Sequence, residues 1–211
     1  MKALLADIHA CTACAPHLPL GPRPVLQAHP DARLLIAAQA PGRKVHETGI
    51  PFNDASGERL RAWLGLSRDT FYDPRQVAIV PMGFCFPGTG RSGDLPPRPE
   101  CAALWHEQLL AQLTQVRLKL VIGTHAQAYH LPGSGHATLS ERVRDWQAMW
   151  PHTVALPHPS PRNNIWLKRH PWFESELLPA LKPLVQKALS GELNLTGPEW
   201  FDKRITRERA P

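Results

Sequence analysis

Four short apolar runs recur along the chain, and segments with helical periodicity separate them. The runs cover 32–38 (ARLLIAA), 76–80 (QVAIV), 118–123 (LKLVIG) and 153–156 (TVAL). Runs of this length and composition are typical of strands that are buried on both faces. Strands that alternate with helices pair in parallel, so the chain is predicted to be an α/β protein. The expected architecture is a three-layer α/β/α fold around a central, mainly parallel four-stranded sheet.

The segments between and after these runs predict helices. We expect helices over 53–66, 98–113, 124–131, 138–150 and 171–191. The first of them can begin at Asn53, Asp54 or Ser56, whose side chains cap helix N-termini, and it is expected to end at Gly65. The last is expected to bend near Pro179 and Pro183, because proline lacks the backbone donor that a helix needs, and to stop at Gly191.

Length and composition predict one globular domain. The chain has 211 residues, of which 43% are hydrophobic and 20% charged, and this suits a single core. We place the domain at 1–190 and a polar, basic extension at 191–211. No apolar run approaches the ~20 residues of a membrane span, and the N-terminus lacks a signal-like apolar core. The expected protein is therefore a cytoplasmic monomer without a membrane partner.

The charge balance favours a polyanionic partner. The formal net charge is +6, with an isoelectric point near 9.5. A basic surplus of this size suits a nucleic acid, although many soluble proteins are also basic.

Three loops rich in proline and glycine follow predicted strands, at 39–54, 81–93 and 158–164. Ligands of parallel α/β sheets bind beyond the carboxyl ends of the strands. We therefore expect the three loops to line one cleft.

His158 is the strongest candidate among the 11 histidines. It follows the last predicted strand and stands among Pro157, Pro159 and Pro161, which lower the entropy cost of holding its position. A positioned imidazole can stabilise a developing negative charge or act as a general acid or base. A structural histidine is the alternative.

Polar and basic side chains continue beyond His158. Ser160, Arg162, Asn163 and Lys168 can contact phosphates at a positive rim, although the same residues are ordinary on a solvated helix start.

The first loop offers groups that suit a flat ligand. Gly42 permits a close approach of the backbone, and Phe52 can stack on a planar ring or simply pack in the core. Gln39 and Asn53 add polar groups to the same loop.

The four cysteines suggest a metal centre. Cys11 and Cys14 form a C-x2-C pair, whereas Cys85 and Cys101 lie far along the chain beside prolines. Four thiolates can hold a tetrahedral zinc ion or an iron–sulfur cluster. Four inert buried cysteines are the remaining possibility.

Two segments resemble the signature motifs of the uracil-DNA glycosylase superfamily. They are LLIAAQAPGRKVHETGIPFNDASGERL (34–60) and LPHPSPRN (156–163). The order and spacing of the four cysteines are similar to those of the iron–sulfur branch, usually called family 4. The resemblance covers roughly residues 4–190.

The resemblance implies excision of a damaged base from DNA. Such an enzyme flips a nucleotide out of the stack and hydrolyses its glycosidic bond. By this resemblance, His158 stabilises the charge on the departing base and Phe52 stacks on it. Backbone groups of Gln39 and Ala40 contact the base edge or the attacking water.

The resemblance also assigns roles at the rim and in the cysteine set. Ser160 pinches phosphates, and Arg162 acts as a wedge in the vacated stack. Cys11, Cys14, Cys85 and Cys101 hold a structural [4Fe-4S] cluster, with zinc or no metal as the alternative. The partner is DNA that contains uracil or a related deaminated base.

Three departures from the family pattern leave the excised base and the water-activating group open. Ala40 stands where some branches have an aspartate, and Gln39 replaces the glutamate of family 4. Pro81 occupies the position of an asparagine that reads uracil. Substitutes can come from the first loop, at Asn53, Asp54, His46 or Glu47.

Two other functions therefore remain open. The first is a catalytically weak or inactive module that binds damaged DNA on the same fold. The second is a hydrolase or transferase that acts on a free nucleoside or another small molecule.

Overall fold

A computed structural model describes residues 1–91, 93–132 and 138–194. Its centre is a four-stranded sheet in the order β2-β1-β5-β6, in which every pair of neighbours is parallel. The strands are β1 (Leu34–Ala38), β2 (Val77–Pro81), β5 (Leu118–Ile122) and β6 (Thr153–Leu156). The predicted sheet is therefore confirmed. The predicted extension 191–211 falls outside the described residues from 195 onward.

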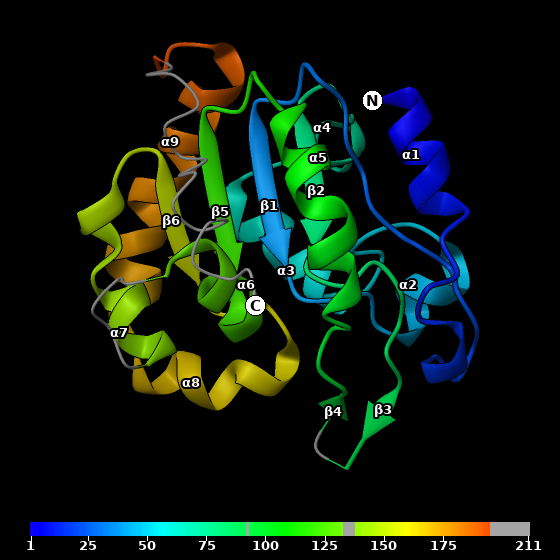
Figure 1. The fold of residues 1–211 in the computed structure, drawn as a ribbon. Coiled ribbons are helices and arrows are strands. Elements are labelled where there is room, and N and C mark those ends of the chain that lie inside the picture. The colour runs from blue at the N-terminus through cyan, green and yellow to red at the C-terminus, as the bar shows by residue number, and fades with distance from the viewer. Residues whose placement is uncertain (92, 133–137, 195–211) are drawn as a thin grey trace.

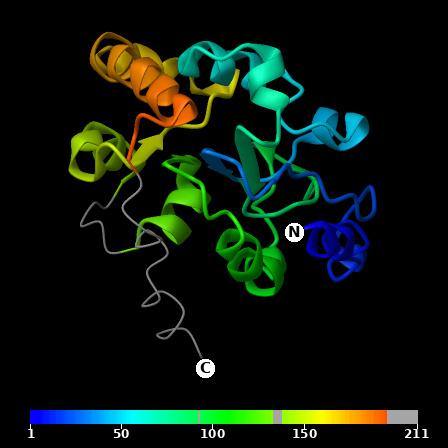
Figure 2. The same ribbon diagram turned by 90° about the horizontal axis from the view of Figure 1, so that it is seen from above.

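Both faces of the sheet are covered by helices, which gives three layers (Figures 1 and 2). Leu34 and Ile36 of β1 pack with the helices α3 (Ala55–Leu64) and α9 (Leu178–Ser190) on one face, whereas Leu35 packs with α1 (Lys2–His9) and α5 (Glu107–Ala111) on the other. This two-sided burial explains why the strands are continuous apolar runs rather than alternating ones. The α-helices are α1 (Lys2–His9), α2 (Arg43–Thr48), α3 (Ala55–Leu64), α4 (Arg68–Tyr72), α5 (Glu107–Ala111), α6 (Gly123–His130), α7 (Leu139–Arg144), α8 (Asn164–Arg169) and α9 (Leu178–Ser190).

The helix predicted over 53–66 is confirmed as α3. Its N-cap is Asp54, whose Oδ1 accepts a hydrogen bond from the Gly57 N–H at 2.9 Å. Its C-cap is Gly65, which has a left-handed backbone at φ 66°. Of the three N-cap candidates from the sequence, Asn53, Asp54 and Ser56, the structure therefore selects Asp54.

Three predicted helices are divided in the structure. The segment 98–113 forms a π-helix, η2 (Ala102–His106), followed by α5. The segment 138–150 forms α7 and a 3₁₀ turn, η3 (Trp146–Met149), because the backbone of Asp145 leaves the helical region at ψ 35°. The segment 171–191 forms a π-helix, η5 (Phe173–Leu177), before α9. Pro179 stands in the first turn of α9, where a missing donor costs little, and Gly191 ends the helix as predicted.

A small hairpin was not predicted. The loop 81–93 contains β3 (Thr89–Gly90), which pairs antiparallel with β4 (Gly93–Asp94). The hairpin projects beyond the carboxyl ends of the parallel strands (Figure 1). In the described part of the chain, every helix is too short or too polar to cross a membrane.

The direction in which strands are added reverses between β1 and β5. The chain places β2 on one side of β1 and then returns to place β5 on the other side. Such a switch point is where α/β sheets bind ligands. Gln39 follows β1 there, and Gly123 follows β5 with φ +82°. A Cβ at Gly123 would lie 2.8 Å from Gln39 Cδ, so the glycine makes room for the Gln39 side chain.

A second close approach fixes the loop that carries Phe52. Phe52 has a left-handed backbone at φ 53°, which is uncommon for an aromatic residue. Its carbonyl accepts a hydrogen bond from Tyr72 Oη at 3.2 Å. A Cβ at Gly57 would lie 1.7 Å from the Phe52 carbonyl oxygen, so only glycine allows α3 to pass this close.

The contact between Gly57 and Phe52 predicts the direction in which a substitution changes the free energy of unfolding. Helix propensity alone favours Gly57→Ala by about 1 kcal/mol, whereas overpacking of this kind costs about 1–3 kcal/mol. We expect Gly57→Ala to lower the free energy of unfolding in urea titrations. Ala55→Gly, at an exposed position of the same helix, is the control and reports propensity alone. A Gly57→Ala variant more stable than the parent protein would contradict the close approach.

Candidate active site

One cavity of about 760 Å³ lies at the carboxyl ends of the parallel strands. Its walls come from all three of the loops that were expected to share a cleft, and from the hairpin. The predicted residues that line it are Gln39, Ala40, Gly42, Phe52, His158, Ser160, Arg162 and Asn163. The loops therefore meet as expected.

Asn53 and Lys168 are outside the lining of this cavity. Asn53 Oδ1 accepts a hydrogen bond from Arg68 Nη2 at 3.1 Å, which ties the side chain to α4. Lys168 lies in the last turn of α8. Of the substitutes considered in the first loop, Asp54 lines the cavity, whereas His46 and Glu47 do not.

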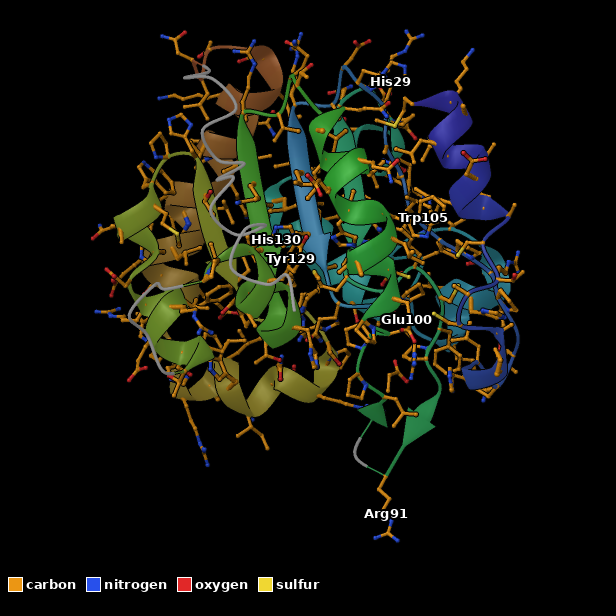
Figure 3. The ribbon with its side chains drawn as sticks, viewed as in Figure 1. His29, Arg91, Glu100, Trp105, Tyr129 and His130 are labelled. Atoms are coloured by element: carbon orange, nitrogen blue, oxygen red, sulfur yellow. The ribbon has the colours of Figure 1, made fainter. Side chains whose placement is uncertain are left out.

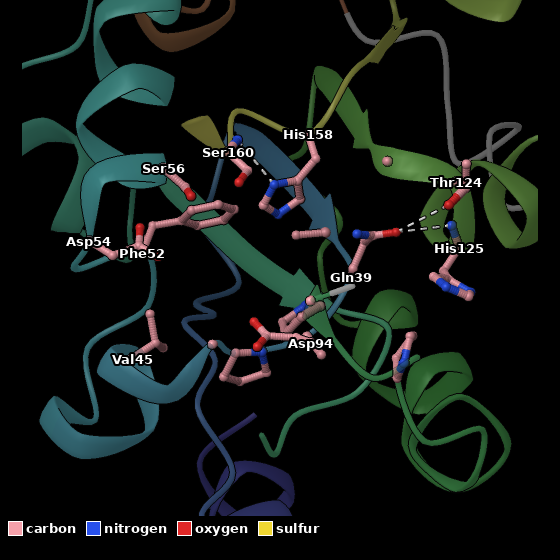
Figure 4. A pocket seen from close by; sticks show the side chains of 18 of the residues that line it. Gln39, Val45, Phe52, Asp54, Ser56, Asp94, Thr124, His125, His158 and Ser160 are labelled. Carbon is pink, nitrogen blue, oxygen red and sulfur yellow. Dashed lines mark hydrogen bonds between the residues drawn. The ribbon is translucent and has the colours of Figure 1, made fainter. Parts of the chain in front are cut away.

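His158 is held in one protonation state by its own loop. The Ser160 N–H donates to His158 Nδ1 at 3.2 Å (Figure 4). Burial lowers the pKa of His158, and the charges of Asp54 and Asp94 partly oppose this shift. Because Nδ1 accepts a hydrogen bond, the neutral imidazole carries its proton on Nε2. His158 is thus a neutral hydrogen-bond donor.

The loop around His158 is rigid for several reasons besides its prolines. Asn163 Nδ2 donates to the His158 carbonyl at 2.7 Å, and Arg59 Nη1 donates to the Ser160 carbonyl at 3.2 Å. Ser160 Oγ accepts from the Arg162 N–H and so caps the 3₁₀ turn η4 (Pro161–Asn163). The amide of Asn163 therefore serves the loop itself.

Gln39 is oriented by the start of α6. Its Oε1 lies 3.3 Å from Thr124 Oγ1 and accepts from the His125 N–H at 3.4 Å. Figure 4 shows the amide nitrogen on the other side, toward His158. The side chain thus offers the cavity a donor rather than an acceptor.

Phe52 and His158 share the same hollow, and Figure 4 shows the two rings beside each other. The Phe52 ring is supported by Phe71 in an edge contact, with centroids 6.2 Å apart and an interplanar angle of 81°. The left-handed backbone and the Tyr72 hydrogen bond described above fix its position. The arrangement suits a flat ring placed against Phe52 with a polar edge near His158.

Several lining residues were missed from the sequence. They are Ser56, Asp94, Leu95, Thr124, His125 and Trp166. Asp94 lies on β4 of the hairpin, so its place in the cavity could be predicted only after the hairpin had been predicted. The glycines that flank Arg91 in GTGRSGD were an available signal, since such residues favour tight hairpin turns.

Pro81 also lines the cavity, at the carboxyl end of β2. Its carbonyl lies 3.1 Å from Nε2 of His106, a buried histidine whose burial lowers its pKa to about 4. This part of the wall has no side-chain amide with which to read a base.

The four cysteines line a second, small cavity together with Leu18, Pro22, Pro24, Phe84 and Trp105. The four cysteines form no disulfide with one another, and Cys11 is the most exposed of them. Cys11 and Cys14 follow α1, Cys85 follows β2, and Cys101 directly precedes η2. Within the described ranges, no set of three or more His, Cys, Asp or Glu side chains has the geometry of a site for a metal ion.

The surroundings of these thiols disfavour the thiolate form. Burial raises the pKa of the Cys14 and Cys85 thiols, and it raises that of Cys101 to about 12. A metal centre bound to the cysteines would compensate the charge of their thiolates. The four cysteines that share this cavity are the residues that would hold a cysteine-ligated centre.

Comparisons with known proteins point to one family. A family model described as "Uracil DNA glycosylase superfamily" matches residues 26–182. A protein of Thermotoga maritima, "Type-4 uracil-DNA glycosylase", is 27% identical over 150 residues, which are 69% of this chain and 74% of the relative. The matched region contains the whole parallel sheet and both loops that hold Phe52 and His158. The chain therefore belongs to the uracil DNA glycosylase superfamily.

Proposed function

We propose that the protein is a DNA glycosylase that hydrolyses the N-glycosidic bond of uracil or a related deaminated base in DNA. The observation that carries the proposal is one cavity in which a neutral imidazole donor and an aromatic ring meet at the carboxyl edge of the sheet. A flipped nucleobase has the flat face and the acceptor oxygens that these two groups suit. Family membership supports the same reaction class.

His158 would act on the leaving base. As the glycosidic bond breaks, negative charge moves onto the base and positive charge onto the sugar. The Nε2–H of neutral His158 can donate to the base oxygen that gains this charge. Such a preorganised donor acts without reorganisation at the moment of reaction. The Ser160 N–H would keep the proton on Nε2 throughout.

Base choice would depend on few polar groups. The Gln39 amide nitrogen faces the cavity, while Pro81 contributes no side-chain donor or acceptor. We therefore expect the enzyme to accept more than one deaminated base, because a wall without directed hydrogen bonds discriminates weakly.

DNA would be held at the cavity mouth. Ser160 and Arg162 line the rim there, and the net charge of +6 favours phosphates. Affinity that rests on phosphate contacts falls as salt rises.

The cysteine site would hold an iron–sulfur cluster. Cys11 and Cys14 would join the N-terminal segment to Cys85 and Cys101, which flank the hairpin loop in the sequence. A cluster ligated by four cysteines supplies cross-linking of these segments, and hydrolysis needs no electron transfer. The proposed role is therefore structural.

Replacement of His158 tests the proposed role of the imidazole. We expect His158→Ala to lower the single-turnover rate of uracil release by about 10²–10³, the usual effect of removing a donor from a developing oxyanion. The measurement is strand cleavage at the abasic product of a uracil-containing oligonucleotide. His29→Ala is the control, since His29 lies at the opposite end of the molecule from the hairpin (Figure 3).

Two results would count against the proposal. A His158→Ala variant with the parent rate would exclude the role given to the imidazole. A parent protein that leaves uracil, hypoxanthine and xanthine oligonucleotides intact, yet binds them tightly, would instead indicate a damage-binding module.

The metal content provides an independent prediction. Protein purified without oxygen should be brown and contain iron and acid-labile sulfide, and Cys101→Ser should lose both. Loss of the cluster should also lower the melting temperature, because the N-terminal segment is no longer cross-linked. Stoichiometric zinc, or a colourless protein without metal, would refute the cluster.

A further inference from the structure

Hydrolysis requires a group that accepts a proton from water, and the motif residues do not supply one. His158 Nδ1 already accepts the Ser160 N–H. Gln39 presents a donor to the cavity, because its Oε1 is engaged by α6. Ala40 has no polar side chain. The acceptor must therefore come from another part of the lining.

Within the described lining of the cavity, the carboxylates are Asp54 and Asp94. Asp54 is engaged at the start of α3, where its Oδ1 accepts the Gly57 N–H at 2.9 Å. That bond satisfies a donor of the helix terminus and ties the carboxylate to a structural task. Among the described residues, the hydrogen bond that Asp94 Oδ1 accepts comes from Thr89 Oγ1 and is long, at 3.5 Å, so it holds this carboxylate more weakly.

Asp94 is placed against the first motif loop. A Cβ at Gly42 would lie 3.3 Å from Asp94 Oδ2, so the carboxylate rests on the backbone two residues after Ala40. Its charge, like that of Asp54, opposes the lowering of the His158 pKa. Figure 4 shows Asp94 across the cavity from Phe52 and His158.

The hairpin that carries Asp94 is anchored to the rest of the molecule. Thr89 pairs with Asp94 across the two strands, and the Leu95 N–H donates to the Gly88 carbonyl at 2.8 Å. The Arg162 guanidinium packs against Gly93, where a Cβ would lie 2.1 Å from Nη1. The side chain assigned as a wedge thus lies beside the hairpin.

We propose that Asp94 is the general base of the reaction, an inference that rests on the proposed glycosylase function. Water attacks C1′ of the sugar while the C1′–N bond breaks, and the electron pair of that bond leaves with the base. One water proton passes to the Asp94 carboxylate, and the remaining hydroxyl becomes the 1′-OH of the abasic sugar. The carboxylate thus replaces the acidic side chain that position 39 lacks.

Asp94→Asn tests the assignment in single-turnover assays with a uracil-containing oligonucleotide. The amide keeps the shape but cannot accept the proton, so we expect the rate to fall about 100-fold or more, as is usual when a general base is removed. Binding to an oligonucleotide with an abasic-site analogue, measured by fluorescence anisotropy, should stay within about 3-fold of the parent value, since ground-state contacts are kept.

Azide distinguishes a general base from a side chain that only supports the loop. Azide is a nucleophile that needs no deprotonation, so it should accelerate base release by Asp94→Ala and give a glycosyl azide in place of the abasic sugar. The same concentration of sodium chloride controls for salt, which weakens binding to DNA. The parent enzyme should not be accelerated.

One variant controls for position. Arg91→Ala alters the tip of the same hairpin, where the side chain points away from the body (Figure 3). This variant should keep most of the catalytic rate.

The outcomes separate the two proposals. A parent enzyme that releases base while Asp94→Asn is equally fast overturns the role of Asp94 alone. Loss of rate in Asp94→Ala without rescue by azide also overturns it, because a positioning role would then explain the loss. A parent enzyme that releases no base overturns the glycosylase function and this inference together.

Discussion

The hydrogen bond from the Ser160 N–H to His158 Nδ1 determines what the cavity can do. It uses the one lone pair of the neutral imidazole, so the ring can donate but not accept. The surrounding loop stabilises this bond. Prolines restrict its backbone, and the side chains of Asn163 and Arg59 donate hydrogen bonds to the carbonyls of His158 and Ser160. His158 is therefore available to catalysis as a donor, and the acceptor of the water proton must be another group.

The second constraint is steric. Gly123 leaves space for Gln39 at the switch point, and Gly57 leaves space for the Phe52 carbonyl. Both glycines lie where a side chain would push a cavity residue away from its partner. The parallel sheet brings the loops to one edge. The close approaches at Gly123 and Gly57 then place the Gln39 amide and the Phe52 ring together at that edge.

Sequence reasoning found the parts of the structure that depend on local pattern. The four strands are apolar because both faces are buried, and the residues around His158 and Phe52 carry recognisable motifs. It missed Asp94 because a two-residue strand pair has no hydrophobic periodicity. It proposed Asn53 for base binding, although Arg68 draws that side chain to α4. Contacts between segments far apart in the chain decide such details, and no local pattern encodes them.

The tautomer of His158 is the most direct test of the central claim. Long-range ¹H–¹⁵N spectra of protein labelled in its histidines distinguish a protonated Nε2 from a protonated Nδ1. The account predicts a neutral ring with its proton on Nε2 at pH 7, and a ring that is still mostly neutral at pH 6.5, because burial lowers the pKa of His158. A proton on Nδ1, or an imidazolium at neutral pH, would contradict it.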